Sequence, residues 1–569
     1  MSEPKQLPIV DHNPASGTST PGVDPTLNGQ IDVQTVPQAP QSRRRGLRFW
    51  MVIVAMMVTE FLSAIELTSV ATALPTIVED LHGTQFSWVG AAYALGSTAI
   101  LPMTGGLAQI FGRRPIVIGS IGFFALGSGI CGGASNMHML IAGRAIQGVG
   151  GGGILSLSDI VVADLVPLNE RGTFIGLFGA MWAIASAIGP PLGGAFSQSN
   201  WRWLFYMNLP ITGFAAILTL FSLQLIKGPS EDGLGNKMRR MDLIGNAIII
   251  VSTTITIVAL TWAGVQHSWG SAAVLVPLVL GLLGIGAFFV YEAKVPVEPV
   301  VPWELISNRT SFFGYASVFL HGVISTAVIY YLPIYFQATL EQGPVKSGIS
   351  LFGNAFTIAP GAIFAGASAA IFPVYRPQNA IGWVLTAVGI GLLSLLDASS
   401  SKAEWVGYQV IEGIGLGFLF TAPQFPVLAP LPVTETAHAL AFFTFVRCFA
   451  QTWGVTIGAT ILQNELKKKL PRAFLEGLGS SAEKGVEITY AAIPAIRSLE
   501  EPVKTEVKRA FSASLRVIWL VMAGISAAGI LLVLGMKDLK MHEVTDEDWG
   551  LKEKKKPNED VESPAEKPL

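Results

Sequence analysis

Residues 139–162 of the chain read MLIAGRAIQGVGGGGILSLSDIVV. These 24 residues carry only two charged side chains, Arg144 and Asp159. A helix needs about 20 apolar residues to cross the hydrocarbon core of a bilayer, so this stretch is long enough to span a membrane. An arginine inside a span normally faces a partner or a water-filled cavity, and a glycine run permits close packing against another helix. Arg144, Gln147, Gly148 and Gly151 lie on one helical face.

The composition extends this interpretation to the whole chain. Of its 569 residues, 51% are hydrophobic and 13% are charged, about half the charged share of soluble domains. Residues 1–48, 463–514 and 537–569 hold 42 of the 76 charged side chains. A water-soluble globule could not cover its surface with the few that remain. The composition therefore excludes a soluble enzyme and a disordered regulator, and it predicts an all-α polytopic membrane protein.

Apolar runs of about 20 residues, separated by short polar breaks, predict fourteen membrane spans. They are 49–73, 87–110, 115–134, 139–162, 173–195, 203–226, 242–264, 272–293, 311–336, 348–371, 379–397, 405–429, 437–461 and 515–536.

The distribution of Lys and Arg predicts the orientation. With residue 48 on the cytoplasmic side, the short inner loops hold ten Lys and Arg residues and the short outer loops hold three. Both termini are then inside. Residues 1–48 are predicted to be a disordered cytoplasmic tail, 463–514 an extracellular loop, and 537–569 a cytoplasmic tail.

Several functional classes find no support in the sequence. The net charge of −2 gives no indication of a basic surface that would bind nucleic acid. Cys131 and Cys448 lie in apolar runs, so we expect neither a disulfide framework nor a metal site. No phosphate-binding loop of the ATP-driven pumps is present, and we expect no cofactor.

Two further segments combine glycines with residues that affect helix packing, arginines in the first segment and prolines in the second. Residues 105–114 read GGLAQIFGRR, in which Gly105 and Gly112 allow close approach and Arg113 and Arg114 can pair with carboxylates or helix ends. Residues 179–194 read GAMWAIASAIGPPLGG, with Gly189, Pro190, Gly193 and Gly194 at a predicted kink.

Together with Arg144 in its span, these motifs resemble those of the major facilitator superfamily. The segments 66–77 (ELTSVATALPTI) and 200–210 (NWRWLFYMNLP) resemble its fourteen-span drug:proton antiporter family, closest to the fungal toxin and multidrug efflux members. The chain departs from the usual pattern at Gln109 and Ile110, where an acid and a base are common, at Ala185 for a glycine, and at Glu66 for an aspartate.

The resemblance implies an architecture of two six-helix bundles, 49–226 and 311–536, joined by two linker spans within 227–310. It also implies transport by alternating access, in which the two bundles rock around a central site. We expect a monomer whose partners are protons, a small-molecule substrate and lipid. The plasma membrane is the expected location, with the vacuolar membrane as the alternative.

Ionisable residues inside spans are the functional candidates. Glu66 and Arg144 lie at similar depth in their spans, so we predict that they interact and that Glu66 carries the proton. Asp159, near the inner end of the same span as Arg144, completes the predicted proton-coupling set. The predicted substrate cavity is lined by Glu60, Gln147, Trp182, Tyr331, Glu412 and Arg447, and His321, Tyr330 and Phe420 are further candidates.

These features predict a secondary transporter that exports small amphipathic molecules in exchange for protons, and not an enzyme. Two other hypotheses stay open. One is a narrow-substrate fourteen-span porter for siderophores or basic amino acids. The other is a non-transporting membrane receptor, to which the altered positions Gln109 and Ile110 lend slight support.

Overall fold

The computed structural model describes residues 45–81, 87–224, 233–264, 267–296, 298–477, 492–493, 495–546, 549 and 551. Most of the predicted N-terminal tail, part of the loop 463–514 and the last eighteen residues of the C-terminal tail lie outside the described residues. The chain divides into the units Met1–Arg45 and Gly46–Leu569, and all that follows concerns the second.

The fold consists of helices, and the described residues form no β-strand. The first group of helices is α1 (Leu47–Asp80), α2 (Ser87–Phe111), α3 (Arg113–Gly132), α4 (Met137–Leu165), α5 (Leu168–Ser199), α6 (Trp203–Tyr206), α7 (Asn208–Ser222), α8 (Leu234–Arg240), α9 (Leu243–Trp262) and α10 (Ala272–Glu292). The second group is α11 (Glu304–Ser307), α12 (Arg309–Ile334), η1 (Tyr335–Thr339), α13 (Pro344–Ser350), α14 (Phe352–Ile371), α15 (Arg376–Leu393), α16 (Lys402–Thr421), α17 (Gln424–Leu428), η2 (Val433–Glu435), α18 (Thr436–Lys469), α19 (Arg472–Gly477) and α22 (Val503–Gly535).

Thirteen helices in the described part of the chain are long and apolar enough to cross a membrane, and the chain is an integral membrane protein. The predicted span 379–397 corresponds to α15, an 18-residue helix that is not among the thirteen. Its first turn carries Arg376, Gln378 and Asn379, which lower its mean hydropathy. The count of fourteen is therefore not confirmed, although α15 packs between α16 and α22.

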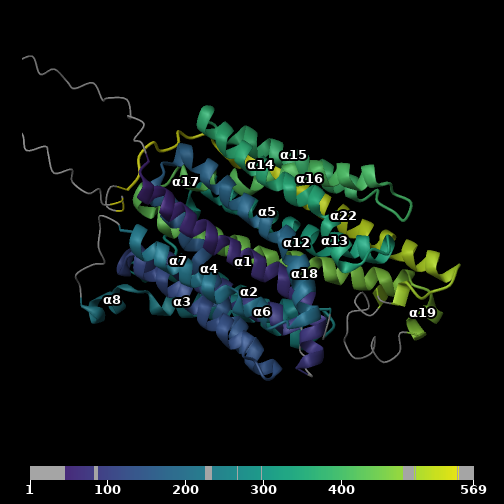
Figure 1. Cartoon of the computed structure of the whole chain (residues 1–569). Coiled ribbons are helices and arrows are strands. Elements are labelled where there is room, and N and C mark those ends of the chain that lie inside the picture. Colours follow the sequence, from purple (N-terminus) through teal and green to yellow (C-terminus); the bar gives the residue numbers. More distant parts are fainter. Residues whose placement is uncertain are drawn as a thin grey trace, which may run out of the picture. The chain divides into compact units, whose positions relative to one another are not determined.

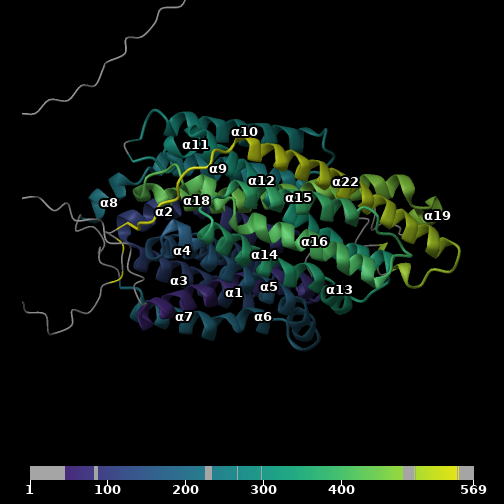
Figure 2. The same ribbon diagram turned by 90° about the horizontal axis from the view of Figure 1, so that it is seen from above.

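The helices run along a common direction, with α8 and α17 at one end and α19 at the other (Figure 1). We call the end that holds Leu47, Phe111 and Leu168 the inner end, after the predicted orientation. Helices α1–α7 pack among themselves, as do α12, α14–α16, α18 and α22. The main contacts between these two groups are α5 with α14 and α2 with α18. Helices α9 and α10 pair with each other beside α2 and α18 (Figure 2).

The glycine run of α4 explains how this helix packs between two neighbours. A side chain at Gly148 would overlap the backbone of α2 at Tyr93, and one at Gly150 would overlap the backbone of α3 at Phe124. Small residues at such contacts let membrane helices approach closely. Dispersion forces then stabilise the contact, because the hydrophobic effect does not drive association between helices that are surrounded by lipid. The run therefore sets the positions of the polar side chains that α4 carries.

Several helix starts are fixed by side-chain caps. Asn136 accepts a hydrogen bond of 2.9 Å from the backbone N–H of Met139 at the start of α4. Ser401 and Glu404 form a capping box at the start of α16. Such caps satisfy backbone donors that a helix leaves without partners.

The outer end carries a partly exposed ion cluster around Glu341. Its carboxylate oxygens lie 2.8 Å from Lys504 Nζ and 2.9 Å from Lys508 Nζ. Hydrogen bonds from these two lysines hold the pKa of Glu341 below its usual value of 4.5. A lowered pKa means that the cluster stabilises the folded chain above the unfolded pKa and that this contribution is lost as the pH falls through the folded pKa.

We therefore expect Glu341→Gln to lower the free energy of unfolding at pH 7 by about 0.2–1 kcal/mol, the usual range for exposed pairs. Thermal unfolding between pH 3 and 8 measures the effect, and the difference from the wild-type chain should disappear at the acid end. A difference that persists unchanged at low pH would contradict the assignment to the ion cluster.

Candidate functional site

A buried polar network lies in the first group of helices and centres on Glu66 of α1. Arg144 Nη1 on α4 donates a hydrogen bond of 2.6 Å to Glu66 Oε1. Asn208 Nδ2 on α7 donates one of 2.6 Å to Glu66 Oε2. The Glu66 and Arg144 side chains are 0% and 1% exposed, so the pair is cut off from solvent. The predicted contact between the two residues is thus present, and Asn208 is an additional partner.

Three further groups fix the guanidinium of Arg144. Its Nε donates to the carbonyl of Val89 on α2 at 3.1 Å, and its Nη1 also donates to Gln147 Oε1 at 2.7 Å. The guanidinium carbon lies 4.6 Å from the ring centroid of Tyr93. A buried charge is tolerated when its donors are satisfied in this way, whereas removing one partner of a buried pair typically costs about 3–5 kcal/mol.

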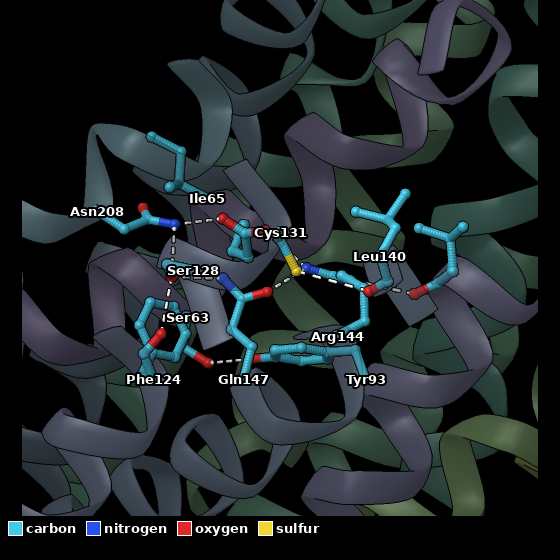
Figure 3. Close-up of polar contacts among 12 residues, drawn as sticks. Ser63, Ile65, Tyr93, Phe124, Ser128, Cys131, Leu140, Arg144, Gln147 and Asn208 are labelled. Carbon is cyan, nitrogen blue, oxygen red and sulfur yellow. Dashed lines mark hydrogen bonds and ion pairs between the residues drawn. The ribbon is translucent and has the colours of Figure 1, made fainter. Parts of the chain in front are cut away.

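Ser128 on α3 links the two halves of the network (Figure 3). Its hydroxyl accepts from Gln147 Nε2 at 2.8 Å and from Asn208 Nδ2 at 3.4 Å. Gln147 is fully buried within the network. It was predicted to line the substrate cavity and instead bridges α4 to α3, because its helical face points into the first group of helices.

Sequence reasoning did not identify Asn208 and Ser128 as site residues. Asn208 lies in the motif 200–210, and the same motif ties the outer end of α1 to α6. Trp201 Nε1 and Arg202 Nη1 both donate to Asp80 Oδ2 at 3.0 Å. A polar residue inside an apolar span was the available signal for Asn208, whereas a serine in a span is too common to single out.

A second set of ionisable residues lies at the contact between the two groups of helices. Trp182 Nε1 on α5 donates to Glu60 Oε2 on α1 at 3.1 Å. Thr444 Oγ1 on α18 donates to Asp159 Oδ2 on α4 at 3.4 Å. The structure thus places Asp159 against the opposite group of helices and away from Glu66, with which it was predicted to act.

Arg447 of α18 belongs to the same set, and we call Glu60, Asp159 and Arg447 the interface cluster. Its Nη2 donates to the carbonyl of Phe420 at 2.9 Å, and its guanidinium carbon lies 4.5 Å from the Phe420 ring centroid and 4.8 Å from that of Phe443. Arg447 interacts electrostatically with Glu60 and Asp159 across the interface. Its Nε is buried and has no hydrogen-bond partner among the described residues.

The remaining predicted cavity residues lie elsewhere. Tyr331 on α12 is 4% exposed, and its hydroxyl donates to the carbonyl of Val455, so it packs inside the second group of helices. Glu412 on α16 is fully buried and accepts from Asn354 Nδ2 on α14. The prediction that Tyr331 and Glu412 line the cavity together with Arg447 therefore receives no support from their positions. His321 is buried and interacts electrostatically with Arg447, and Tyr330 is 41% exposed.

An apolar groove of about 470 Å³ lies between α5 and α14. Its lining residues are Ile184, Ala187, Ile188, Pro191, Leu192, Phe352 and Phe356.

Of the predicted conformational residues, Gly189 faces α1, where a side chain would overlap Thr68, while Gly194 lies near Val345 of α13. Gly193 is buried, and α5 continues through position 190 as a single helix.

The inner ends of the two groups are in close contact. A side-chain carbon at Gly105 on α2 would lie 2.8 Å from the carbonyl oxygen of Ala437 on α18. Gln109 Nε2 donates to the carbonyl of Thr434 at 3.2 Å, so this departure from the usual motif supplies a contact between the groups. On the opposite side, a side chain at Gly172 would overlap the backbone of Gly366 on α14.

The two arginines of the 105–114 motif have separate partners. Arg113 Nε donates to Asp164 Oδ2 at 3.0 Å in a buried pair, whereas Arg114 Nη2 donates to the carbonyl of Leu220 at 2.6 Å. Gly112 has a φ of +88°, a conformation that glycine adopts at low cost and that makes the tight turn between α2 and α3.

The described residues after α22 contact the inner ends of both groups, and we call residues 537–546, 549 and 551 the inner strap. Lys537 N donates to Thr310 Oγ1 at 3.3 Å, and His542 Nε2 lies 2.8 Å from the carbonyl of Leu431. Trp549 is 4% exposed, and the Arg113 guanidinium carbon lies 3.7 Å from its ring centroid. The strap therefore contacts the second group first and then the arginine of the 105–114 motif.

We expect Trp549→Ala to release the strap, because it removes the ring that packs against Arg113. Partial release exposes backbone to protease without global unfolding. Trypsin cleavage after Lys537 or Lys540 should accelerate by about tenfold, as expected for a loss of about 1.4 kcal/mol in local stability. Trp303→Ala is the matched control, because Trp303 is 49% exposed. Equal cleavage rates in the two variants would contradict the docked strap.

Comparison with known proteins agrees with the geometry. Residues 56–455 match the family model described as Major Facilitator Superfamily. The chain is 38% identical over 562 residues to the efflux pump FUS6 of Gibberella moniliformis, covering 98% of this chain and 99% of the relative. It is 38% identical over 543 residues to the MFS-type efflux pump LUC4 of a Fusarium species, covering 94% of this chain and 96% of the relative.

Solved structures show the same fold at low sequence identity. The proton:xylose symporter XylE superposes with a TM-score of 0.55 at 12% identity, covering 88% of this chain and 98% of that chain. The human organic anion transporter MFSD10 gives a TM-score of 0.53 at 12% identity, covering 86% and 100%. The family match and the near full-length relatives establish that this chain belongs to the major facilitator superfamily of membrane transporters.

Proposed function

We propose that the chain exports small amphipathic molecules in exchange for protons by alternating access. The observation that carries the proposal is Glu66, a carboxylate fully buried among membrane helices and bonded to Arg144 and Asn208. An ionisable residue inside a span is costly and is retained where it serves transport. The relatives named as efflux pumps support the direction of transport.

In this mechanism the ionised Glu66 is held by Arg144 and Asn208. Rearrangement of the helices separates Glu66 from these donors, and the isolated carboxylate then takes up a proton because a buried charge without partners is unfavourable. Proton binding at Glu66 and substrate binding exclude one another, which makes the exchange obligatory.

The interface cluster is proposed as the part of the substrate site that changes between the two access states. Glu60 and Asp159 belong to the first group of helices and Arg447 to the second. Rocking of the groups changes the separation of these charges, so the affinity for a polar or charged substrate group changes with it. The apolar groove between α5 and α14 suits the apolar part of an amphipathic substrate.

The inner-end contacts at Gly105 and Gly172 support assignment of the structure to an inner-closed state. In the proposed cycle the proton reaches Glu66 from the outer side while the inner end is closed, after Glu66 has separated from Arg144 and Asn208, and the inner-open state receives the substrate. We propose the plasma membrane as the location and a monomer as the working unit.

Transport from vesicles tests the proposal. The purified chain is reconstituted in liposomes loaded with a panel of fluorescent dyes and toxins, with and without an imposed pH gradient. Gradient-dependent movement of several unrelated compounds is expected. A second panel contains siderophores and amino acids, and transport of a single compound from it would replace the proposal with a narrow-substrate porter. If no compound from either panel is transported, the proposed transport function is wrong.

A further inference from the structure

The inner end of the α9–α10 hairpin holds two carboxyl groups that face each other. Asp242 is the N-cap of α9, and Glu292 is the last residue of α10. Asp242 Oδ2 and Glu292 Oε1 flank the same point, because a side-chain carbon at Gly245 would overlap both atoms. These two oxygens lie 2.0 Å and 2.4 Å from that point, so they are no more than 4.4 Å apart. We call them the hairpin acid pair.

The other oxygen of each group has ordinary donors. Asp242 Oδ1 accepts from the backbone N–H of Gly245 at 2.8 Å and from the hydroxyl of Tyr291 at 3.1 Å. Glu292 Oε2 accepts from the backbone N–H of Val301 at 3.3 Å. The facing oxygens, Asp242 Oδ2 and Glu292 Oε1, are buried and have no donor among the described residues. Glu292 itself is only 4% exposed.

No basic side chain in the described part of the chain neutralises the pair, since no Lys, Arg or His there lies within ion-pair distance of Asp242 or Glu292. The charged groups of adjoining segments have other partners. Arg240 Nε lies 3.0 Å from Glu298 Oε1. Lys237 Nζ lies 5.7 Å from the Phe111 ring centroid on α2, and on the α18 side His438 Nδ1 lies 3.2 Å from Glu435.

Two ionised carboxylates cannot remain in contact in a buried place, because their repulsion is unscreened there. When two carboxyl groups share a site, one proton between them removes the repulsion and supplies the missing donor. We propose that the hairpin acid pair is a proton-binding site in which one carboxyl O–H donates to the facing oxygen of the other.

The shared proton joins three segments of the chain. It links the start of α9 to the end of α10, and through Val301 it links both to the segment that leads into α11 and α12. The pair thus holds a proton for structural purposes. It lies in a different part of the fold from Glu66, and transport in the E66Q variant does not report on it.

Gly245 keeps the space for this contact. The hairpin is otherwise closely packed, because side chains at Gly281 and Gly284 on α10 would overlap Thr256 and Ser252 on α9. At Gly245 the neighbours are the two acids themselves, so an alanine there must separate them. At Gly286 on α10 an added carbon meets nothing within 4 Å.

Infrared difference spectroscopy tests the site on the purified full-length chain. The wild-type spectrum at neutral pH should contain the carbonyl stretch of one more protonated carboxylic acid than the spectra of Glu292→Gln and of Asp242→Asn. In each variant the amide N–H replaces the O–H donor and the remaining acid ionises, so the melting temperature should stay close to that of the wild type. Loss of the band in only one variant, or in neither, would overturn the shared proton.

Thermal unfolding distinguishes the shared proton from a repelling ionised pair and from a bound cation. If the pair were ionised and repelling, Glu292→Gln would raise the melting temperature by several degrees. If a cation were bound, the melting temperature of the wild type alone would rise with added Na⁺, K⁺ or Ca²⁺. Either result overturns the proposal. Gly245→Ala should lower the melting temperature and remove the infrared band, whereas Gly286→Ala should do neither.

Discussion

Glu66→Gln is expected to abolish gradient-driven transport, reducing it to the background of protein-free vesicles. The amide keeps the shape of the carboxylate and its oxygen can still accept from Arg144, but its NH2 group cannot accept from Asn208 Nδ2, and it can neither bind nor release a proton. The substitution also leaves the buried charge of Arg144 without its counter-ion, which should cost about 3–5 kcal/mol of stability. Dye release and thermal unfolding of the same preparation measure the two effects.

A double variant separates proton coupling from structural support. Glu66→Gln combined with Arg144→Gln removes both buried charges, so stability should recover, as it often does when a whole buried pair is replaced. Transport should stay absent, because no titratable group remains at this position. If the double variant transports like the wild type, the pair is structural and Glu66 does not carry the proton. Glu66→Asp, which keeps a carboxylate, is expected to retain part of the activity.

In the proposed cycle, Gly105→Ala is expected to shift the transporter away from the inner-closed state. The added carbon would lie 2.8 Å from the Ala437 carbonyl oxygen and 3.0 Å from His438 Cα, both in the backbone of α18. Backbone atoms cannot rotate away, so α2 and α18 must separate. Overpacking of this kind costs about 1–3 kcal/mol, which corresponds to a shift of about 5- to 150-fold in the equilibrium between states.

The neighbouring glycine gives a matched control. An added carbon at Gly106 meets only the His438 side chain, at 3.7 Å, which is an ordinary contact. Distances between spin labels at position 119 on α3 and position 434 before α18 report inner-end separation, in a background with Cys131 and Cys448 replaced by alanine. Gly105→Ala should populate a longer distance and Gly106→Ala should not. Identical distance distributions would contradict a close α2–α18 contact at the inner end in membranes.

The site illustrates which part of a membrane protein can be predicted from one sequence. The contact between Glu66 and Arg144 was predicted from their similar depth in the membrane. A helix rises by about 1.5 Å per residue, so the number of residues from the end of a span gives the depth of a side chain. Asp159 was assigned to the same set, and the structure places it against Thr444 of α18 instead. Depth says nothing about the direction in which a side chain points around the helix axis, and that direction decides the partner.

The membrane class and the approximate helix positions could be predicted from the chain alone, because hydropathy is a local property that adds up along each segment. The family resemblance followed from short motifs, which are local as well. The partners of the buried polar side chains became clear only from the packed helices. Asn208 donates to Glu66 from 142 residues away in the sequence, Trp549 packs against Arg113, and Asp242 faces Glu292 across a hairpin. Such contacts depend on how neighbouring helices are rotated and shifted, which close packing at residues such as Gly148 and Gly150 of α4 sets, and no single segment contains that information.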